Sequence, residues 1–224
     1  MKTLLVPLAL ASLLLTAPAA GADQAAAREQ LAKAGIAFTP EAFLQAVSMS
    51  ESAHAALFVE AGIDPSVRSP GNRTALWIAT ERHDLETLTA LLAAGLKPDA
   101  KTAPPLDGGK SLVFEAVDSG DPAIVRALAE AGADVKAVND YGVSPLSEAA
   151  RVGNLEICQI LLKAGADPNV APGGFPMIYG PVNENHLEVV RLLLASGAKL
   201  GEHKPALLEA AKTPEMKALL EAAE

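Results

Sequence analysis

The chain has 224 residues, half of them apolar and only 4% aromatic, and its formal net charge is −9. Alanine and leucine supply most of the apolar side chains, which favours closely packed helices over a β-sandwich. An acidic chain argues against nucleic acid as a partner, because phosphate binding depends on clustered lysine and arginine. The single cysteine cannot form an internal disulfide, so the fold must rely on packing alone.

Residues 1–22 have the pattern of a signal peptide. Lys2 gives a positive start, residues 4–15 are apolar, and Ala20 and Ala22 stand where signal peptidase reads small side chains. The apolar run is shorter than the roughly 20 residues that a membrane-spanning helix needs. We therefore expect cleavage after Ala22, no membrane span in the mature protein, and a periplasmic or secreted location. A retained membrane anchor is the alternative.

Residues 23–34 predict a helix that leads into the rest of the chain, because alanines alternate there with charged side chains. Residues 35–224 are then expected to form one domain. Its first helix begins after Thr39, whose hydroxyl suits the N-cap, with Pro40 in the first turn. A second helix is expected over residues 52–61.

A glycine ends an apolar, helix-like segment six times, at a spacing of about 33 residues. Glycine suits this position because it takes the left-handed conformation that closes a helix without steric cost. The pattern predicts a stack of similar helix–turn–helix units. The glycines are Gly35, Gly62, Gly95, Gly132, Gly165 and Gly197.

The most regular unit spans residues 142–169. Ser144 can cap its first helix, Pro145 fits the first turn, and Asn154 can cap its second helix. One spacing, from Gly95 to Gly132, is longer than the others, so a longer loop is expected within residues 96–109. That loop is either part of a binding face or a tolerated surface insertion.

These units resemble ankyrin repeats, whose signature includes Thr-Pro-Leu-His-x-Ala. The matching segments are Ser144-Pro145-Leu146-Ser147-Glu148-Ala149 and, more loosely, Thr74-Ala75-Leu76-Trp77-Ile78-Ala79. The resemblance implies an all-α ankyrin-repeat solenoid of stacked helix–turn–helix units joined by short β-turn or hairpin loops. About six units are expected, including an atypical cap at each end. The last cap is expected to be two short helices over residues 205–211 and 214–222.

The side chains that could carry chemistry do not form a recognisable site. His83 and His186 lie in turns about three repeats apart, so they cannot converge on one metal ion. Cys158 lies at a seam position, where a cysteine behaves as a small apolar side chain. Neither glycine pair, at residues 108–109 and 173–174, has the spacing of a phosphate-binding loop. We therefore expect no enzyme activity, no metal and no cofactor.

Four residues occupy the position at which the ankyrin signature carries histidine: Trp77, Phe114, Ser147 and Tyr179. Two interpretations of the three rings stay open. They either fill space between repeats that are rich in alanine, or they offer anchors to a partner, as aromatic side chains often do. Packing is the preferred interpretation for Phe114.

Proteins similar to this one contact their partners with loop tips and with the exposed face of each first helix. The resemblance thus implies a set of partner-binding residues. Tyr141 and Phe175 stand out, because an apolar ring at a loop tip has no core to fill. The full set is Arg73, Trp77, Glu81, Lys110, Asp118, Asp140, Tyr141, Arg151, Phe175, Tyr179 and Asn183.

The expected function follows from the fold and the export signal. We expect a monomeric, non-catalytic scaffold that binds another exported protein, in its more specific form an inhibitor or immunity-type binder. The acidic charge would suit a basic target. The alternatives are a small-ligand site or an enzymatic role in the concave groove.

Overall fold

The computed structural model describes residues 20–98 and 110–223, and within these ranges the secondary structure is helical, with no strand. The expected all-α fold is confirmed. Two short 3₁₀ turns, η1 (Pro172–Gly174) and η2 (Gly201–His203), accompany the α-helices. The α-helices are α1 (Ala20–Lys33), α2 (Pro40–Ser48), α3 (Ser52–Glu60), α4 (Ala75–Glu81), α5 (Leu85–Ala93), α6 (Leu112–Ser119), α7 (Pro122–Glu130), α8 (Pro145–Arg151), α9 (Leu155–Lys163), α10 (Tyr179–Asn183), α11 (Leu187–Ala195), α12 (Lys204–Ala210) and α13 (Pro214–Ala222).

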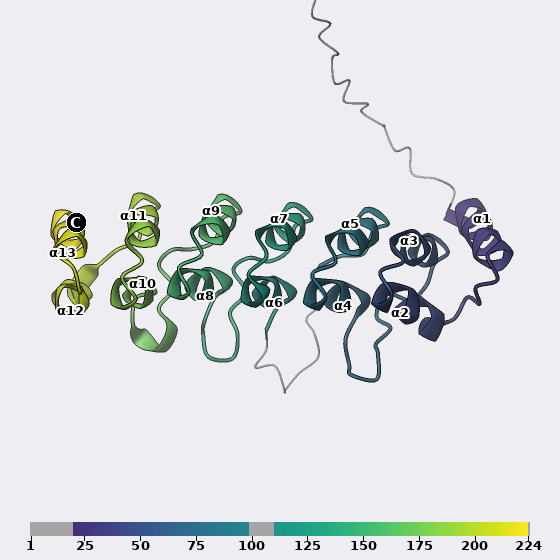
Figure 1. The fold of residues 1–224 in the computed structure, drawn as a ribbon, viewed down its shortest axis with the longest axis horizontal. Helices are drawn as coiled ribbons and strands as arrows, with labels where there is room; N and C mark the ends of the chain where they lie inside the picture. Colours follow the sequence, from purple (N-terminus) through teal and green to yellow (C-terminus); the bar gives the residue numbers. More distant parts are fainter. Residues whose placement is uncertain (1–19, 99–109, 224) are drawn as a thin grey trace, which may run out of the picture.

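The helices form two parallel rows that run the length of an elongated array (Figure 1). The first-helix row contains α2, α4, α6, α8, α10 and α12, and each contacts the next. The second-helix row contains α3, α5, α7, α9, α11 and α13, again in contact in that order. The connections that lead into α4, α8 and α10 project below the first-helix row (Figure 1). This is the solenoid arrangement, in which each unit packs mainly on its two neighbours.

Side-chain caps start most of the helices, as the sequence predicts. The hydroxyls of Thr74, Ser111 and Ser144 accept hydrogen bonds from backbone N–H groups of α4, α6 and α8, at 3.1 to 3.4 Å. Asp84 and Asn154 cap α5 and α9 in the same way, at 3.0 and 3.1 Å. Each cap satisfies a donor that a helix leaves unpaired, so the helix begins at a fixed residue.

The turn inside each unit, from the pair α2 and α3 to the pair α10 and α11, contains one residue with left-handed backbone. Gly153 supplies it after α8 with a φ of 80°, whereas His83 and Asn185 adopt φ values of 56° and 61° after α4 and α10. The N–H of Asp84, the residue after His83, donates to the carbonyl of Ala79 at 2.9 Å and closes the turn. His83 therefore has a place in the turn, as predicted.

One apolar position holds the array together. It lies four residues before the glycine that ends each second helix, and its side chain is fully buried in every unit. Because these side chains stack along the array, each second helix is fixed to its neighbours by a continuous seam. The residues are Leu31, Phe58, Leu91, Leu128, Leu161 and Leu193.

Helix α1 occupies the end of the second-helix row (Figure 1). Leu31 is the seam residue of α1, and the helix packs on α3. Arg28 donates from Nε to the carbonyl of Ala61 at 3.0 Å, and its guanidinium lies 4.5 Å from the ring centre of Phe38. The predicted lead-in helix is thus the second helix of a half unit, and it covers the N-terminal end of the seam.

The other end closes with α12 and α13. Thr213 caps α13 by accepting from the N–H of Met216 at 3.3 Å, and Lys204 donates to the carbonyl of Glu221 at 3.1 Å. No helix within the described residues has the length and apolar character to cross a bilayer. The longer loop expected within residues 96–109 falls largely outside the described part of the chain.

Candidate protein-binding surface

The loop before α8 is a built turn that carries an exposed ring. The Asn139 side-chain oxygen accepts from the N–H groups of Tyr141 and Val143, both at 3.0 Å. The N–H of Asn139 also donates to the carbonyl of Val143 at 3.0 Å. These bonds hold the tip in one conformation, and Tyr141 projects from it with 77% of its surface exposed. Within residues 20–98 and 110–223 no ring or cation contact to Tyr141 is present.

The loop before α10 presents a second ring by different means. Gly173 and Gly174 both have positive φ, 63° and 84°, within η1. The N–H of Met177 donates to the carbonyl of Val170 at 3.1 Å and closes the loop. Phe175 follows the two glycines and is 58% exposed. The glycine pair therefore forms a turn.

In the units of α4 and α6, three side chains come together beside the first helix: those of the residue before the cap, the third residue after it and the seventh. We call these three positions, and the positions aligned with them in the repeats of α8 and α10, the first-helix slot. In the slot of α4, the guanidinium of Arg73 lies 4.8 Å from the ring centre of Trp77, and its Nε is 3.9 Å from a carboxylate oxygen of Glu81. Cation, ring and carboxylate are thus paired within the chain.

The burial of Trp77 favours the packing interpretation of its ring over that of a partner anchor. Only 1% of Trp77 is exposed, because the ring fills the space between α4 and its neighbours while Arg73 lies over it. The packing interpretation also holds for Phe114, which is 3% exposed. Of the rings in this register, Tyr179 alone reaches the surface, with 36% exposed.

The slot of α6 repeats the arrangement of α4. Lys110 Nζ lies 5.2 Å from the ring centre of Phe114 and forms an ion pair with Asp118. That hydrogen bond to Asp118 raises the pKa of Lys110 and outweighs the opposing effect of its partial burial. The two consecutive units therefore carry a cation, an aromatic ring and a carboxylate at the same three positions.

The slots of α8 and α10 depart from this pattern. In α8 the three positions hold Val143, Ser147 and Arg151, and the Ser147 hydroxyl is within 2.9 Å of Ser144 Oγ. In α10 they hold Phe175, Tyr179 and Asn183. The two α10 rings have their centres 5.8 Å apart at an interplanar angle of 48°.

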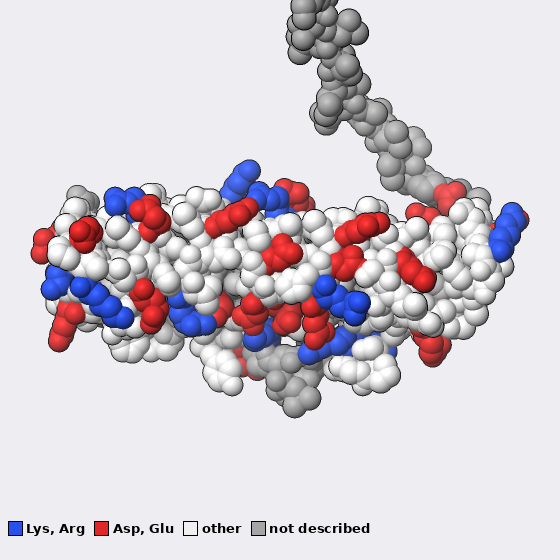
Figure 2. Space-filling model, in the orientation of Figure 1, with Lys and Arg blue, Asp and Glu red and all other residues white. Residues whose placement is uncertain are grey.

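Carboxylates connect the slots into one charged surface. Glu115 in α6, Glu148 in α8 and Glu184 at the end of α10 join Glu81 and Asp118 along the first-helix row. Partial burial raises the pKa of Glu115, with the nearby carboxylates of Asp118 and Glu81 acting in the same direction. Figure 2 shows acidic side chains gathered below the middle of the array, with basic ones on either side.

Arg151 of α8 is influenced by carboxylates of both neighbouring units, Asp118 of α6 and Glu184 at the end of α10. Its guanidinium donates to Glu148 from Nε at 3.1 Å and makes a second, closer bond from its terminal nitrogen. The hydrogen bonds to Glu148 raise the pKa of Arg151, and Asp118 and Glu184 add to the effect. A Cβ on Gly180 would lie 3.5 Å from Arg151, so α8 and α10 approach closely here.

Ten of the eleven sequence-predicted residues lie at the loop tips or on the first-helix row, and the eleventh, Trp77, lies beneath them. The prediction missed Glu115, Glu148 and His203. The first two could have been found, because both lie four residues after the cap and three residues before a predicted position. His203 has no equivalent in the other units, so no repeat pattern indicates it.

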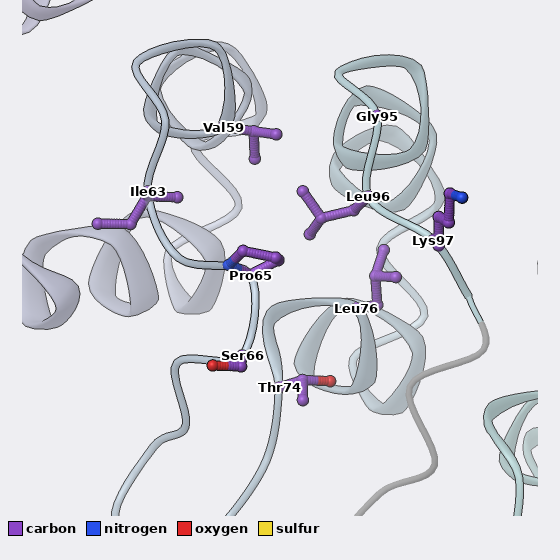
Figure 3. Close-up of a pocket in the computed structure, with 9 residues that line it drawn as sticks. All are labelled: Val59, Ile63, Pro65, Ser66, Thr74, Leu76, Gly95, Leu96 and Lys97. Carbon is purple, nitrogen blue, oxygen red and sulfur yellow. The ribbon is translucent and has the colours of Figure 1, made fainter.

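A hollow of about 520 Å³ opens between the first two complete units, lined by Val59 of α3, by the start of α4 and by the connections that follow α3 and α5 (Figure 3). Val59, Leu76 and Leu96 point into it, and the hydroxyl of Thr74 is already used as the cap of α4. Ligand sites usually combine such apolar walls with several converging polar groups. This hollow has the walls but few polar groups.

Two side chains that could carry chemistry, those of Cys158 and His186, are packed against neighbouring residues. Cys158 is fully buried, and this burial raises the pKa of its thiol to about 12. The His186 ring packs against Gly153 of the preceding unit. No group of three or more potential metal ligands occurs within residues 20–98 and 110–223.

Known proteins share both the sequence pattern and the fold. Residues 42–139 and 102–172 match a family model described as ankyrin repeats (3 copies). A B-cell lymphoma 3 protein homolog from Mus musculus is 31% identical over 147 residues, which make up 65% of this chain and 33% of the mouse protein. This chain thus corresponds to about a third of that relative's length.

Two further similarities cover most of the matched protein. Cyclin-dependent kinase 4 inhibitor B from Rattus norvegicus is 34% identical over 98 residues, 42% of this chain and 75% of that protein. A crystal structure of the ankyrin repeat domain of Bcl-3 superposes with a TM-score of 0.73 at 26% identity, covering 89% of this chain and 92% of that one. With its two helical rows, glycine-closed units and a family model that matches more than half of its residues, the chain belongs to the ankyrin repeat family.

Proposed function

We propose that this protein is a non-catalytic scaffold that binds another exported protein through its first-helix surface, meaning the loop tips and exposed side chains of the first-helix row. Ankyrin repeats serve as scaffolds for protein–protein interaction, which supports this proposal. The observation that carries it is the exposure of Tyr141 and Phe175, 77% and 58%, at two neighbouring loop tips. Exposed rings that fill no core are typical anchors of protein interfaces.

A more specific form of the proposal is an inhibitor or immunity-type binder. The rat relative is by name an inhibitor of a kinase, which supports such a role for a chain of this kind. The net charge of −9 and the carboxylates of the first-helix row favour a basic target. We propose that the protein acts as a monomer and holds one exported protein inactive.

The exported location rests on the pattern of residues 1–22. Helix α1 begins at Ala20, so cleavage after Ala22 would remove part of its first turn and leave Leu31 and Ala27 in place. Mass spectrometry of the protein from its own organism tests this. The proposal expects a mature N-terminus at Asp23 in the exported fraction. An intact Met1 in the cytoplasmic fraction would contradict it.

The binding proposal is tested by capture from the exported fraction with the immobilised protein. The expected result is one basic protein, retained by the unaltered chain and lost, or bound at least about tenfold more weakly, by a Tyr141→Ala, Phe175→Ala double variant. Met49→Ala is the matched control, because Met49 is 60% exposed in the turn between α2 and α3, away from the tips. Equal binding by the double variant would overturn the assignment of this surface.

The competing function is binding of a small apolar ligand in the hollow beside Leu76 and Leu96. It makes a different prediction, since Leu96→Trp would fill the hollow and leave the loop tips unchanged. A ligand role would appear as an organic molecule that co-purifies with the unaltered protein and is lost from this variant. Capture of a protein by both forms supports the scaffold instead.

A further inference from the structure

The slot of α10 is the one whose rings reach solvent among the slots of α4, α6, α8 and α10. Phe175 is 58% exposed and Tyr179 is 36% exposed. The Phe175 ring centre is 5.8 Å from that of Tyr179 and 6.3 Å from that of His203. Three rings from three segments, the loop, α10 and η2, thus form one exposed aromatic cluster near the C-terminal end of the first-helix row.

The equivalent rings of α4 and α6 each lie against a cation of this chain. In α4 a guanidinium lies 4.8 Å from the ring of Trp77, and in α6 an ammonium lies 5.2 Å from the ring of Phe114. Both cations come from the residue before the cap. In α10 the position aligned with these two residues in the repeat holds Phe175, which is uncharged, so the ring of Tyr179 has no cation from its own slot.

Two exposed carboxylates lie close to the cluster along the chain. Glu184 is exposed at the end of α10, accepts a hydrogen bond from Asn183 Nδ2 at 2.9 Å, and forms no ion pair with any described residue. Glu202 is exposed and directly precedes His203. Lys204 directly follows His203, but its ammonium donates to the carbonyl of Glu221 at the end of α13, at 3.1 Å. The basic side chain of α8, Arg151, is already paired with Glu148. Exposed ring faces attract a cation, and carboxylates nearby add to that attraction.

We propose that Phe175, Tyr179 and His203 form a binding site for a lysine or arginine side chain of the partner. This inference rests on the proposed function and names the chemistry of the anchor that the partner inserts. The partner supplies in α10 the cation that Arg73 and Lys110 supply in α4 and α6. An exposed cation over aromatic rings contributes roughly two- to fivefold in affinity by itself.

The site can be tested without knowing the partner. Three heptapeptides with the sequence Gly-Ser-Gly-X-Gly-Ser-Gly, capped at both ends, carry arginine, lysine or norleucine at X. Each is titrated into the isotopically labelled full chain, and the aromatic resonances of Phe175 and Tyr179 are followed by NMR. The expected result is saturable shifts at these rings with arginine or lysine, and binding about two- to fivefold weaker with norleucine. Equal binding of norleucine would show an apolar site and overturn the proposal.

Two variants locate the effect. Tyr179→Leu keeps an apolar side chain of similar reach and removes the ring, so the preference for arginine over norleucine should disappear. Met49→Ala, at the opposite end of the molecule, should keep that preference. A preference that survives in Tyr179→Leu overturns the site. If the peptides show no charge preference while a partner is still captured through the loop tips, the scaffold proposal stands and this inference fails.

Discussion

Single glycines decide how closely neighbouring units approach, and Gly153 does so most directly. Its φ is 80°, and a Cβ at this position would lie 2.6 Å from the ring atoms of His186 in the next unit. Gly165 has a similar φ of 92° with open space around it. The two positions share the left-handed backbone and differ in the contact with His186 and in place, since Gly165 follows α9, so Gly165 is the control for the cost of the backbone conformation.

Gly153→Ala should therefore lower the free energy of unfolding by more than Gly165→Ala. The left-handed backbone costs about 1 to 2 kcal/mol at either position, and the contact with His186 adds about 1 to 3 kcal/mol at Gly153 alone. Urea unfolding of both variants measures the difference. Adding His186→Ala to Gly153→Ala should recover part of the loss. Equal costs at the two glycines would show that the His186 contact carries no weight.

The buried thiol of Cys158 gives a second prediction for a single residue, on the pH dependence of stability. Burial raises the pKa of its thiol from an ordinary value of 9.0 to about 12. The folded state thus holds the proton more tightly than the unfolded state. This contribution to stability is complete below pH 9 and is lost as the pH rises toward 12. At pH 8 a thiol reagent should label the native protein far more slowly than the urea-unfolded protein. Rapid labelling of the native form would place Cys158 outside the seam.

At the scale of elements, the seam explains why these short helices are stable together. Most of the helices have nine residues or fewer, too short to persist alone in water. Each second helix buries one side chain at the position of Leu31, Leu91 and Leu161, and through it contacts the units on either side. Helix α1 has such a neighbour on one side, α3, among the described elements.

Leu161→Ala should lower the free energy of unfolding by about 2 to 5 kcal/mol, because the side chain is fully buried in the middle of the array. Leu85→Ala is the control, since Leu85 is 38% exposed at the start of α5 and should cost less than about 1 kcal/mol. Chemical denaturation of both variants gives the comparison. A cost below about 0.5 kcal/mol for Leu161→Ala would place that residue outside the seam.

The whole molecule shows how far the sequence predicts this fold and its surface. Glycine spacing and capping residues such as Ser144 predict the two helical rows, because both features are local and recur. The sequence left two interpretations of Trp77 open, because its burial depends on how the neighbouring helices and Arg73 lie around the ring. The ring cluster around His203 was also missed, because η2 has no counterpart in the other units.

The seam also indicates, in hindsight, that α1 belongs to the array. Leu31 and Gly35 have the same spacing as Leu161 and Gly165, and each glycine has a positive φ. The alanine-rich composition of residues 23–34 predicts a helix but does not by itself assign that helix to the array. Applying the spacing between seam residue and glycine to Gly35 as well would have placed α1 in the second-helix row.

The central claim is that carboxylates and rings of the first-helix row bind a basic protein. The most direct measurement compares the affinity of the captured partner for two triple variants of equal charge change. One is Glu115→Gln, Glu148→Gln, Glu184→Gln on the first-helix surface; the other is Glu130→Gln, Glu156→Gln, Glu188→Gln on the second-helix row. We expect the first triple to weaken binding about tenfold and to reduce its salt dependence, and the second to change it less than about twofold. Equal effects of both triple variants, or no effect of the first, would contradict the assignment of the first-helix surface as the binding site.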